Sequence, residues 1–152
     1  MFKKIMVCLD GSKIAERILP VVKEQAAAMG SQVVLVRVVN LPGNVTLGVP
    51  GFPSVPLHTA AMPEHLRKEY DLADEYLKKT AQGLQQQGIN VDSQTLVGLP
   101  GPSIINYAGE NGSDLIALVT HGHTGFRNVL LGSVAEHIVK ESGLPILLIR
   151  PK

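Results

Sequence analysis

The chain has 152 residues, of which 45% are hydrophobic and 18% are charged, and its formal net charge is +1. This length is typical of one domain, so we expect a single domain over residues 1–152, and the balanced charge argues against nucleic-acid binding. No apolar run approaches the roughly 20 residues that span a bilayer, and Asp10 follows the N-terminal apolar run too soon for a signal peptide, so we expect a cytoplasmic protein without a membrane partner.

Five short apolar runs predict the strands of a parallel sheet. They cover residues 5–9, 33–39, 91–97, 115–119 and 145–149. Four of them are continuous rather than alternating, which is typical of strands buried on both faces, and the third alternates more weakly. Cys8 lies in the first run and is expected to be a small core residue.

Helical spacings of apolar residues fill the intervals between these runs. A first helix is predicted from an N-cap at Ser12 to a stop at Gly30, with either a kink or a lost internal hydrogen bond at Pro20. Three more are predicted over residues 64–87, about 102–110 and about 133–141. The alternation of strands and helices predicts a doubly wound α/β sheet with right-handed crossovers.

One connection interrupts this alternation. Residues 41–63 contain five prolines and three glycines. A segment of this length and composition predicts a flexible loop without regular structure, and loops of this kind are often functional or disordered.

The stretch Thr120-His121-Gly122-His123-Thr124-Gly125 follows the fourth predicted strand, and Gly132-Ser133 opens the last helix. Glycines let backbone N–H groups approach a ligand closely, and a helix start offers unpaired N–H donors and the positive end of its dipole. This order of a buried strand, a glycine-rich loop and a helix start suits an anionic group such as phosphate.

Ligands of open α/β sheets bind beyond the carboxyl ends of the strands, where the strand order reverses. Asp10, Val38, Gly98 and the glycine-rich stretch all follow predicted strands, so we expect them to converge on one crevice. The carboxylate of Asp10 could hold a ribose hydroxyl or a water bound to a metal ion. The backbone at Val38 could offer a donor and an acceptor to a base.

The same residues could instead have purely structural roles. Asp10 with Gly11 is a common turn pair, and Ser133 could serve only as an N-cap. Gly122 and Gly125 could be required only for positive φ. His121 and His123 lack an evident third metal ligand, so metal binding or acid–base catalysis by them is disfavoured. The dinucleotide motif G-x-G-x-x-G and the P-loop motif do not occur, which argues against a dehydrogenase or a P-loop NTPase.

Several motifs together resemble the universal stress protein family. They are Asp10-Gly11-Ser12, Val97-Gly98-Leu99-Pro100, the stretch from Thr120 to Gly125, Leu130-Leu131-Gly132-Ser133-Val134-Ala135-Glu136 and the closing residues 143–151. The resemblance covers essentially the whole chain. It implies a Rossmann-like five-stranded parallel sheet of order 3-2-1-4-5 and a homodimer paired through the last strand, which runs from Pro145 to Ile149.

The resemblance also implies a site for ATP with Mg²⁺ or Mn²⁺. One branch of the family binds ATP through the motif Gly-x2-Gly-x9-Gly-[Ser/Thr], which Gly122, Gly132 and Ser133 match, whereas Val119 replaces its first glycine. By position, Asp10 would face the ribose or a metal-bound water, Val38 the adenine, and Gly122, Gly132, Ser133 and Val134 the phosphates. Leu9, Val119 and Gly125 complete the implied binding residues.

The resulting expectation is an ATP-binding regulatory protein of the stress response with at most slow ATP hydrolysis. Two alternatives remain. Val119 would add a side chain near the sugar, so the chain could instead be a dimeric interaction protein of the same fold that binds no nucleotide. It could also be an enzyme that uses the same crevice, such as a nucleotide-dependent transferase.

Overall fold

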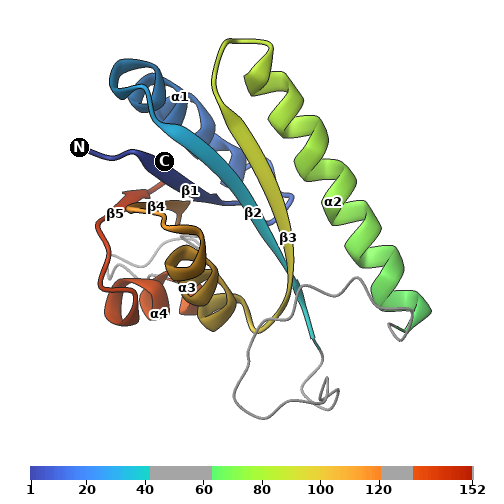
Figure 1. Ribbon diagram of the computed structural model, residues 1–152. Coiled ribbons are helices and arrows are strands. Elements are labelled where there is room, and N and C mark those ends of the chain that lie inside the picture. Colours follow the sequence, from blue (N-terminus) through green and yellow to red (C-terminus); the bar gives the residue numbers. More distant parts are fainter. Residues whose placement is uncertain (42–62, 121–131, 152) are drawn as a thin grey trace.

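The computed structural model describes residues 1–41, 63–120 and 132–151. Its centre is a five-stranded sheet of order β3-β2-β1-β4-β5 (Figure 1), in which every neighbouring pair is parallel. The expected α/β class, the Rossmann-like topology and the strand order are therefore confirmed. The order reverses between β1 and β4, which places the topological switch point between these two strands.

The elements follow the predicted sequence of strands and helices. The strands are β1 (Lys4–Cys8), β2 (Gln32–Asn40), β3 (Val91–Gly98), β4 (Leu115–Val119) and β5 (Ile146–Ile149). The helices are α1 (Ile18–Met29), α2 (Glu64–Gln85), α3 (Pro100–Asn111) and α4 (Ser133–Glu141). Most boundaries lie within two residues of the predicted ones, because apolar periodicity locates elements better than it locates their ends.

The start of the first helix differs from its prediction. A 3₁₀ turn, η1 (Ala15–Arg17), precedes α1, so Pro20 is the third residue of α1 rather than an interior one. A proline in the first turn replaces an N–H that has no intrahelical partner, so the predicted kink is unnecessary. The hydroxyl of Ser12 accepts a 3.1 Å hydrogen bond from the N–H of Ala15 in η1, so it does not cap α1, whose N-cap residue is Arg17.

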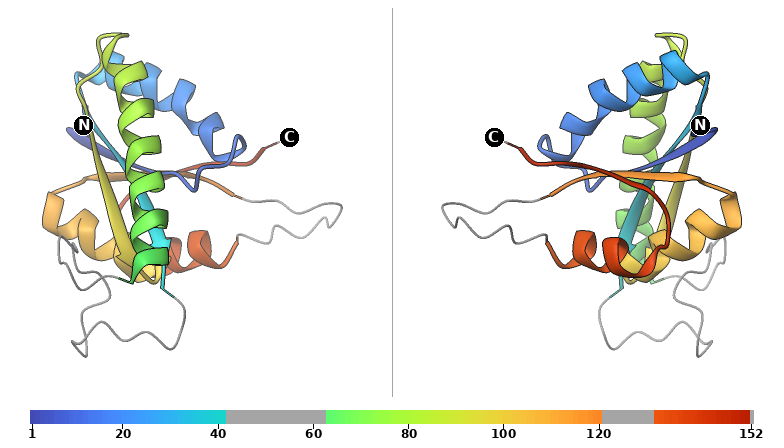
Figure 2. Two further views of the ribbon diagram at one scale, coloured as in Figure 1. Left: turned by 90° about the vertical axis from the view of Figure 1, so that its right-hand side faces the viewer. Right: turned by 90° about the vertical axis from the view of Figure 1, so that its left-hand side faces the viewer.

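Helices cover both faces of the sheet, and each face has its own core. Figure 2 shows α1 on one side of β1, β4 and β5, with α3 and α4 on the other side. Ile5, Val7 and Leu35 are buried in the first core with Ile18 and Leu77, which come from α1 and α2. The second core joins strand residues of the opposite pleat with residues of α3 and α4. Alternate strand residues thus face opposite helix layers.

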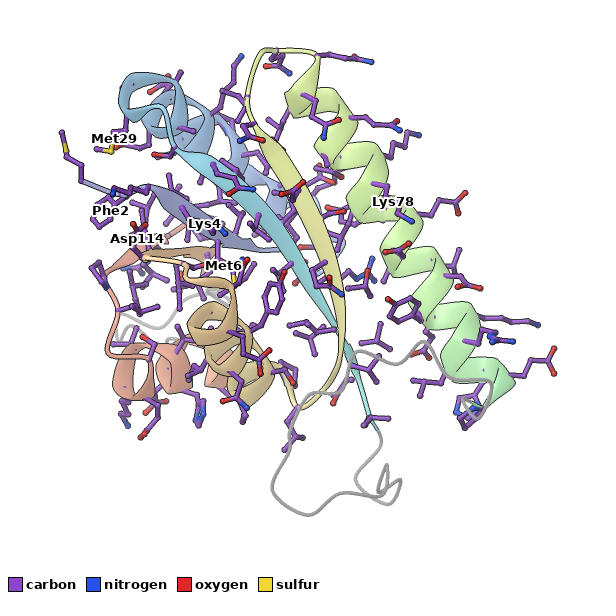
Figure 3. All side chains as sticks on the ribbon, viewed as in Figure 1. Phe2, Lys4, Met6, Met29, Lys78 and Asp114 are labelled. Carbon is purple, nitrogen blue, oxygen red and sulfur yellow. The ribbon has the colours of Figure 1, made fainter. Side chains whose placement is uncertain are left out.

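The amino ends of β1 and β4 are tied by one carboxylate. Lys4 and Asp114 lie close together in Figure 3. The N–H groups of Lys3 and Lys4 donate to Asp114 at 2.8 and 3.0 Å, and Lys4 Nζ donates to the carbonyl oxygen of Asn111 at 2.9 Å. These bonds lie at the end of the sheet opposite to the strand ends where ligands of this fold bind.

None of the helices in the described ranges is long and apolar enough to cross a membrane. Of the predicted loop at residues 41–63, only the first and last residues are described, so that prediction lies outside the described residues.

Candidate functional site

A cavity of about 300 Å³ opens at the carboxyl ends of β1, β2 and β4. The starts of α3 and α4 form its other wall. Its volume lies at the lower end of the roughly 300–1,000 Å³ that is typical of small-molecule sites. Most residues that the sequence assigned to binding lie in this wall, namely Leu9, Asp10, Val38, Val119, Gly132, Ser133 and Val134. Gly122 and Gly125 lie outside the described residues, as do His121 and His123.

The part of the cavity that lies between the sheet and helices α3 and α4 is lined by apolar side chains. It is formed by Val36 and Val38 of β2, Leu118 of β4, Ile104 of α3 and Ala135 of α4. Val36 and Val38 are two residues apart, so their side chains share one face of the sheet. Flat apolar walls of this kind suit the planar ring of a base, because burial of its faces removes apolar surface from water.

The backbone of Val38 faces a gap in the sheet. The N–H of Leu9 donates a 2.9 Å hydrogen bond to the carbonyl oxygen of Val36, and β1 ends at Cys8, opposite Val36. The backbone groups of Val38 point to the same side as those of Val36, because strand residues alternate. In the described part of the chain no strand lies opposite Val38 on that side, so its N–H and C=O are directed past the end of β1.

Asp10 follows β1 and forms the turn that leads into η1. Its carboxylate accepts a 2.8 Å hydrogen bond from the N–H of Ser12, and Gly11 between them has a φ of +86°. The side chain of Asp10 is exposed and belongs to the cavity wall. Asp10 therefore acts as a turn residue, and its side chain also borders the cavity.

The N-terminus of α4 enters the same cavity. Gly132 is its N-cap residue, with φ −51° and ψ 156°, and Ser133 is its first helical residue. The reading of Ser133 as an N-cap is therefore wrong, and within the described residues no side chain caps this end. The N–H groups of the first turn have no intrahelical acceptors and carry the positive end of the helix dipole. This geometry suits a phosphate or another anion.

Close packing between α3 and α4 positions this helix start. A Cβ placed on Gly101 would lie only 2.7 Å from Cδ2 of His137, so the glycine is what allows His137 to sit against α3. Pro100 and Ile104 of α3 consequently line the same cavity as Gly132 and Ser133. His137 is exposed on its helix.

Several wall residues escaped the sequence analysis. Cys8, Val36, Pro100, Ile104 and Leu118 line the cavity, whereas Gly98, which was expected there, is not among the wall residues. The chain passes the crevice at Gly98 and then turns into α3, whose first turn supplies the contacts instead. Val36 could have been predicted as a wall residue, because it lies two residues before Val38 on the same strand and therefore shares its face of the sheet.

Cys8 is half-buried in the cavity wall rather than in the closed core. Burial of its thiol raises its pKa to about 12. At neutral pH the thiol is therefore protonated and a poor nucleophile or metal ligand. Among the described residues no group of three or more histidine, cysteine, aspartate and glutamate side chains could hold a metal ion.

Val119, which stands at the position of the motif's first glycine, belongs to both the cavity and the core. Only 8% of its surface is exposed, and it packs in the core on the α1 side of the sheet together with Leu9 and Ala15. All three also line the cavity. Val119 therefore joins the core on the α1 side of the sheet to the cavity wall beside the β1–η1 turn.

The sequence matches the profile of the Universal stress protein family over residues 1–150. Curated relatives include the Universal stress protein MJ0577 of Methanocaldococcus jannaschii, with 31% identity over 100% of this chain and 97% of that protein. The Universal stress protein YxiE of Bacillus subtilis shares 25% identity over 99% of this chain and 100% of its own length.

Several solved structures have a similar fold. The hypothetical protein MJ0577 superimposes with a TM-score of 0.75 and 26% identity, covering 100% of this chain and 98% of that chain. A universal stress protein in complex with cAMP has a TM-score of 0.68 and 18% identity, covering 98% and 97%. The universal stress protein from Archaeoglobus fulgidus in complex with dAMP has a TM-score of 0.64 and 22% identity, covering 96% of each chain.

Proposed function

Because the chain belongs to the universal stress protein family, we propose that it is a regulatory protein that binds an adenine nucleotide in the cavity at the carboxyl ends of its strands. The observation that carries this proposal is the convergence of three features on one cavity. Asp10, the backbone groups of Val38 that point past the end of β1, and the N-terminus of α4 all border the same cavity of about 300 Å³. They offer a nucleotide a partner for its sugar, its base and its phosphate.

The base would lie on the apolar wall beside Val38. The N–H and C=O of Val38 point past the end of β1, so they can donate to and accept from the edge of an adenine. Val36, Ile104 and Leu118 would cover the faces of the ring. Adenine fits this arrangement because its edge presents an acceptor and a donor side by side.

The phosphates would lie at the start of α4. The N–H groups of Ser133 and Val134 lie in its first turn, and the hydroxyl of Ser133 adds a further donor. Gly132 at the N-cap leaves room for the oxygens, because no described atom lies within 4 Å of where its Cβ would stand. Gly122 and Gly125, which lie outside the described residues, would add to the phosphate site on the basis of the motif match alone.

Asp10 would hold the ribose or a water on a divalent cation. A carboxylate is a suitable ligand for Mg²⁺ or Mn²⁺, which usually keep several waters and bridge to phosphate oxygens. ATP with Mg²⁺ or Mn²⁺ is therefore the ligand we propose first. The complexes of related folds with cAMP and dAMP support adenine mononucleotides as ligands of the same cavity.

One observation favours a second function. Val119 is packed in the core and also lines the cavity together with Asp10. If its methyl groups exclude the ribose, the protein would act as a dimeric interaction protein without nucleotide. The two functions differ in a single measurable property, which is the affinity for adenine nucleotides.

In either case we propose a single-domain, cytoplasmic homodimer that pairs through β5. The strand is an edge of the sheet, and its residues Ile146 to Ile149 are all apolar and half-buried. An apolar edge strand exposes unpaired backbone groups and is a template for pairing with another chain. A second copy of β5 would supply partners for these groups.

Two measurements test the nucleotide proposal. The purified protein is denatured and the supernatant is analysed for released adenine nucleotide by chromatography. Calorimetric titrations with ATP, with and without Mg²⁺, and with AMP and cAMP then give the affinities. Bound nucleotide or saturable heat at millimolar ligand or below is the expected result. Neither nucleotide nor heat in any titration would leave the interaction protein as the remaining function.

A further inference from the structure

The guanidinium group of Arg37 lies next to the turn that carries Asp10. Arg37 lies on β2, one residue before Val38, so its side chain points to the opposite face of the sheet from those of Val36 and Val38 and is not part of the cavity wall. There its guanidinium lies between the β1–η1 turn and α2. Its central carbon is 5.3 Å from the centre of the Tyr76 ring, which comes from α2.

The same guanidinium also packs against Gly11. A Cβ placed on Gly11 would stand 2.8, 3.0 and 3.1 Å from Nη1, Cζ and Nη2 of Arg37. Contact of all three atoms at nearly equal distance means that the planar group lies flat against the Cα of the glycine. Gly11 also has a φ of +86°, so both its backbone conformation and its neighbour exclude a side chain there.

Tyr76 ties the same assembly to the start of the first helical segment. Its hydroxyl donates a 2.9 Å hydrogen bond to Oε1 of Glu16, which lies in η1. The ring of Tyr76 is thereby held by Glu16 at one end and covered by Arg37 on one face. The segment from Asp10 to η1 therefore packs against Arg37 of β2 at Gly11 and is hydrogen-bonded to Tyr76 of α2 at Glu16.

We propose that Arg37 is a positioning residue for the nucleotide site. It holds the Asp10–Gly11–Ser12 turn in the conformation in which Asp10 borders the cavity, and it does so by packing against both Gly11 and Tyr76. This inference rests on the proposed function, because it assigns Arg37 a role in the same site. Arg37 itself touches no nucleotide, since it lies on the far face of the sheet.

The chemistry of the site favours arginine over other long side chains. A guanidinium is planar and stacks on an aromatic face, whereas an ammonium is compact and more strongly hydrated. Lysine would therefore keep the charge over Tyr76 but not the flat contact with Gly11. Methionine would keep a flexible apolar side chain of similar reach and lose both properties.

The test compares Arg37→Met and Arg37→Lys with the control Arg67→Met, which makes the same change at an exposed arginine of α2. Amide hydrogen exchange is measured in the absence of nucleotide at Ser12 and Ala15, whose N–H groups donate to Asp10 and Ser12. The affinity for AMP and Mg–ATP is then measured by calorimetry. This pairing separates the order of the turn from the binding of a ligand.

In Arg37→Met, exchange at Ser12 and Ala15 should rise about fivefold or more and affinity should fall by a similar factor, as expected from the loss of a partly buried cation–π contact. Exchange in the middle of α1 should not change, and Arg37→Lys should lie between wild type and Arg37→Met. Exchange and affinity equal to those of Arg67→Met would overturn the proposal. Faster exchange with unchanged affinity would also overturn it, because the turn would then not control binding.

If Arg37→Met fails to fold, the comparison between Arg37→Lys and wild type decides the question by the same readouts. If wild-type protein binds no adenine nucleotide, the proposed function fails by that result alone. The exchange at Ser12 and Ala15 still reports whether Arg37 orders the turn, and unchanged exchange would then refute its positioning role separately.

Discussion

The carboxylate of Asp10 accepts a 2.8 Å hydrogen bond from the backbone N–H of Ser12, two residues further along the chain. This bond shapes the turn between β1 and η1 and leaves the side chain at the border of the cavity. Asp10 therefore combines a structural and a proposed binding role, and the two can be separated by substitution.

Asp10→Asn should weaken the binding of Mg–ATP by about tenfold, the scale of one lost charge-assisted contact. Asparagine keeps an oxygen that can accept the Ser12 hydrogen bond, so the melting temperature should change little. Metal-free ATP should bind at least as tightly as before, because a negative charge near the phosphates is gone. Calorimetry with and without Mg²⁺ measures both effects. An equal loss in both titrations would show that Asp10 does not act through a metal ion.

Gly132→Val should abolish nucleotide binding without unfolding the protein. The φ of −51° at this N-cap position allows a side chain, and no described atom would contact its Cβ, so the fold can accept valine. The branched side chain would occupy the space of the phosphate oxygens. Gly109→Ala, at an exposed position of α3 with open space around it, is the control. Unchanged affinity with a native circular dichroism spectrum would mean that the phosphates lie elsewhere.

Val119→Ala should lower the free energy of unfolding by about 2 kcal/mol, because it removes buried methyl groups from the core. It should at the same time raise the affinity for ribonucleotides, since the cavity widens beside Asp10. Val33→Ala removes the same atoms from the same core but far from the cavity wall. It should cost similar stability in urea denaturation and leave the affinity unchanged. Weaker binding in Val119→Ala alone would show that the valine supports the sugar.

The Cys8 thiol, whose pKa is raised to about 12 by burial, should react slowly with iodoacetamide at pH 8. Cys8 is the single cysteine of the chain, so mass spectrometry reports its reaction directly. In the unfolded chain the thiol titrates near its ordinary pKa. The buried, protonated thiol therefore makes its full contribution to the free energy of unfolding below about pH 8.5, and this contribution is lost as the pH rises toward 12. Protein in concentrated urea is the reactive control. Equally fast labelling of folded protein at pH 8 would contradict the raised pKa.

Leu148→Pro should convert the proposed homodimer to a monomer. Ile149 directs its carbonyl oxygen to the N–H of Thr120, so its neighbour Leu148 directs its backbone groups to the open edge. Proline removes this outward N–H and is tolerated on an edge strand. Leu148→Ala, which loses a similar side chain and keeps the N–H, should stay dimeric. Analytical ultracentrifugation distinguishes the two states, and a dimer in both variants would place the interface elsewhere.

The predicted strands and helices agree with the structure because their signals are local. Continuous apolar runs identified β4 with its observed ends, and Ser133 and Glu141 bound α4 as predicted. The chain order of these elements, together with the resemblance of its motifs to a family, led to the observed strand order. The structure also shows that most of the predicted binding residues share one cavity.

Other features could be seen only when the chain was folded. Pro100 lines the cavity because α3 starts two residues earlier than its pattern indicated, and Cys8 lies in the wall because β1 ends there. Arg37 and Gly11 are 26 residues apart in the printed sequence, and nothing near either residue predicts their contact.

The sequence by itself therefore determined the elements, the fold class and the residues at the strand ends, since hydrophobic periodicity and turn chemistry act over a few neighbouring residues. Only the tertiary structure decided which side chains meet across the sheet. Contacts such as those of Arg37 with Gly11 and Tyr76 depend on strand register and helix packing, which bring together residues that share no local pattern.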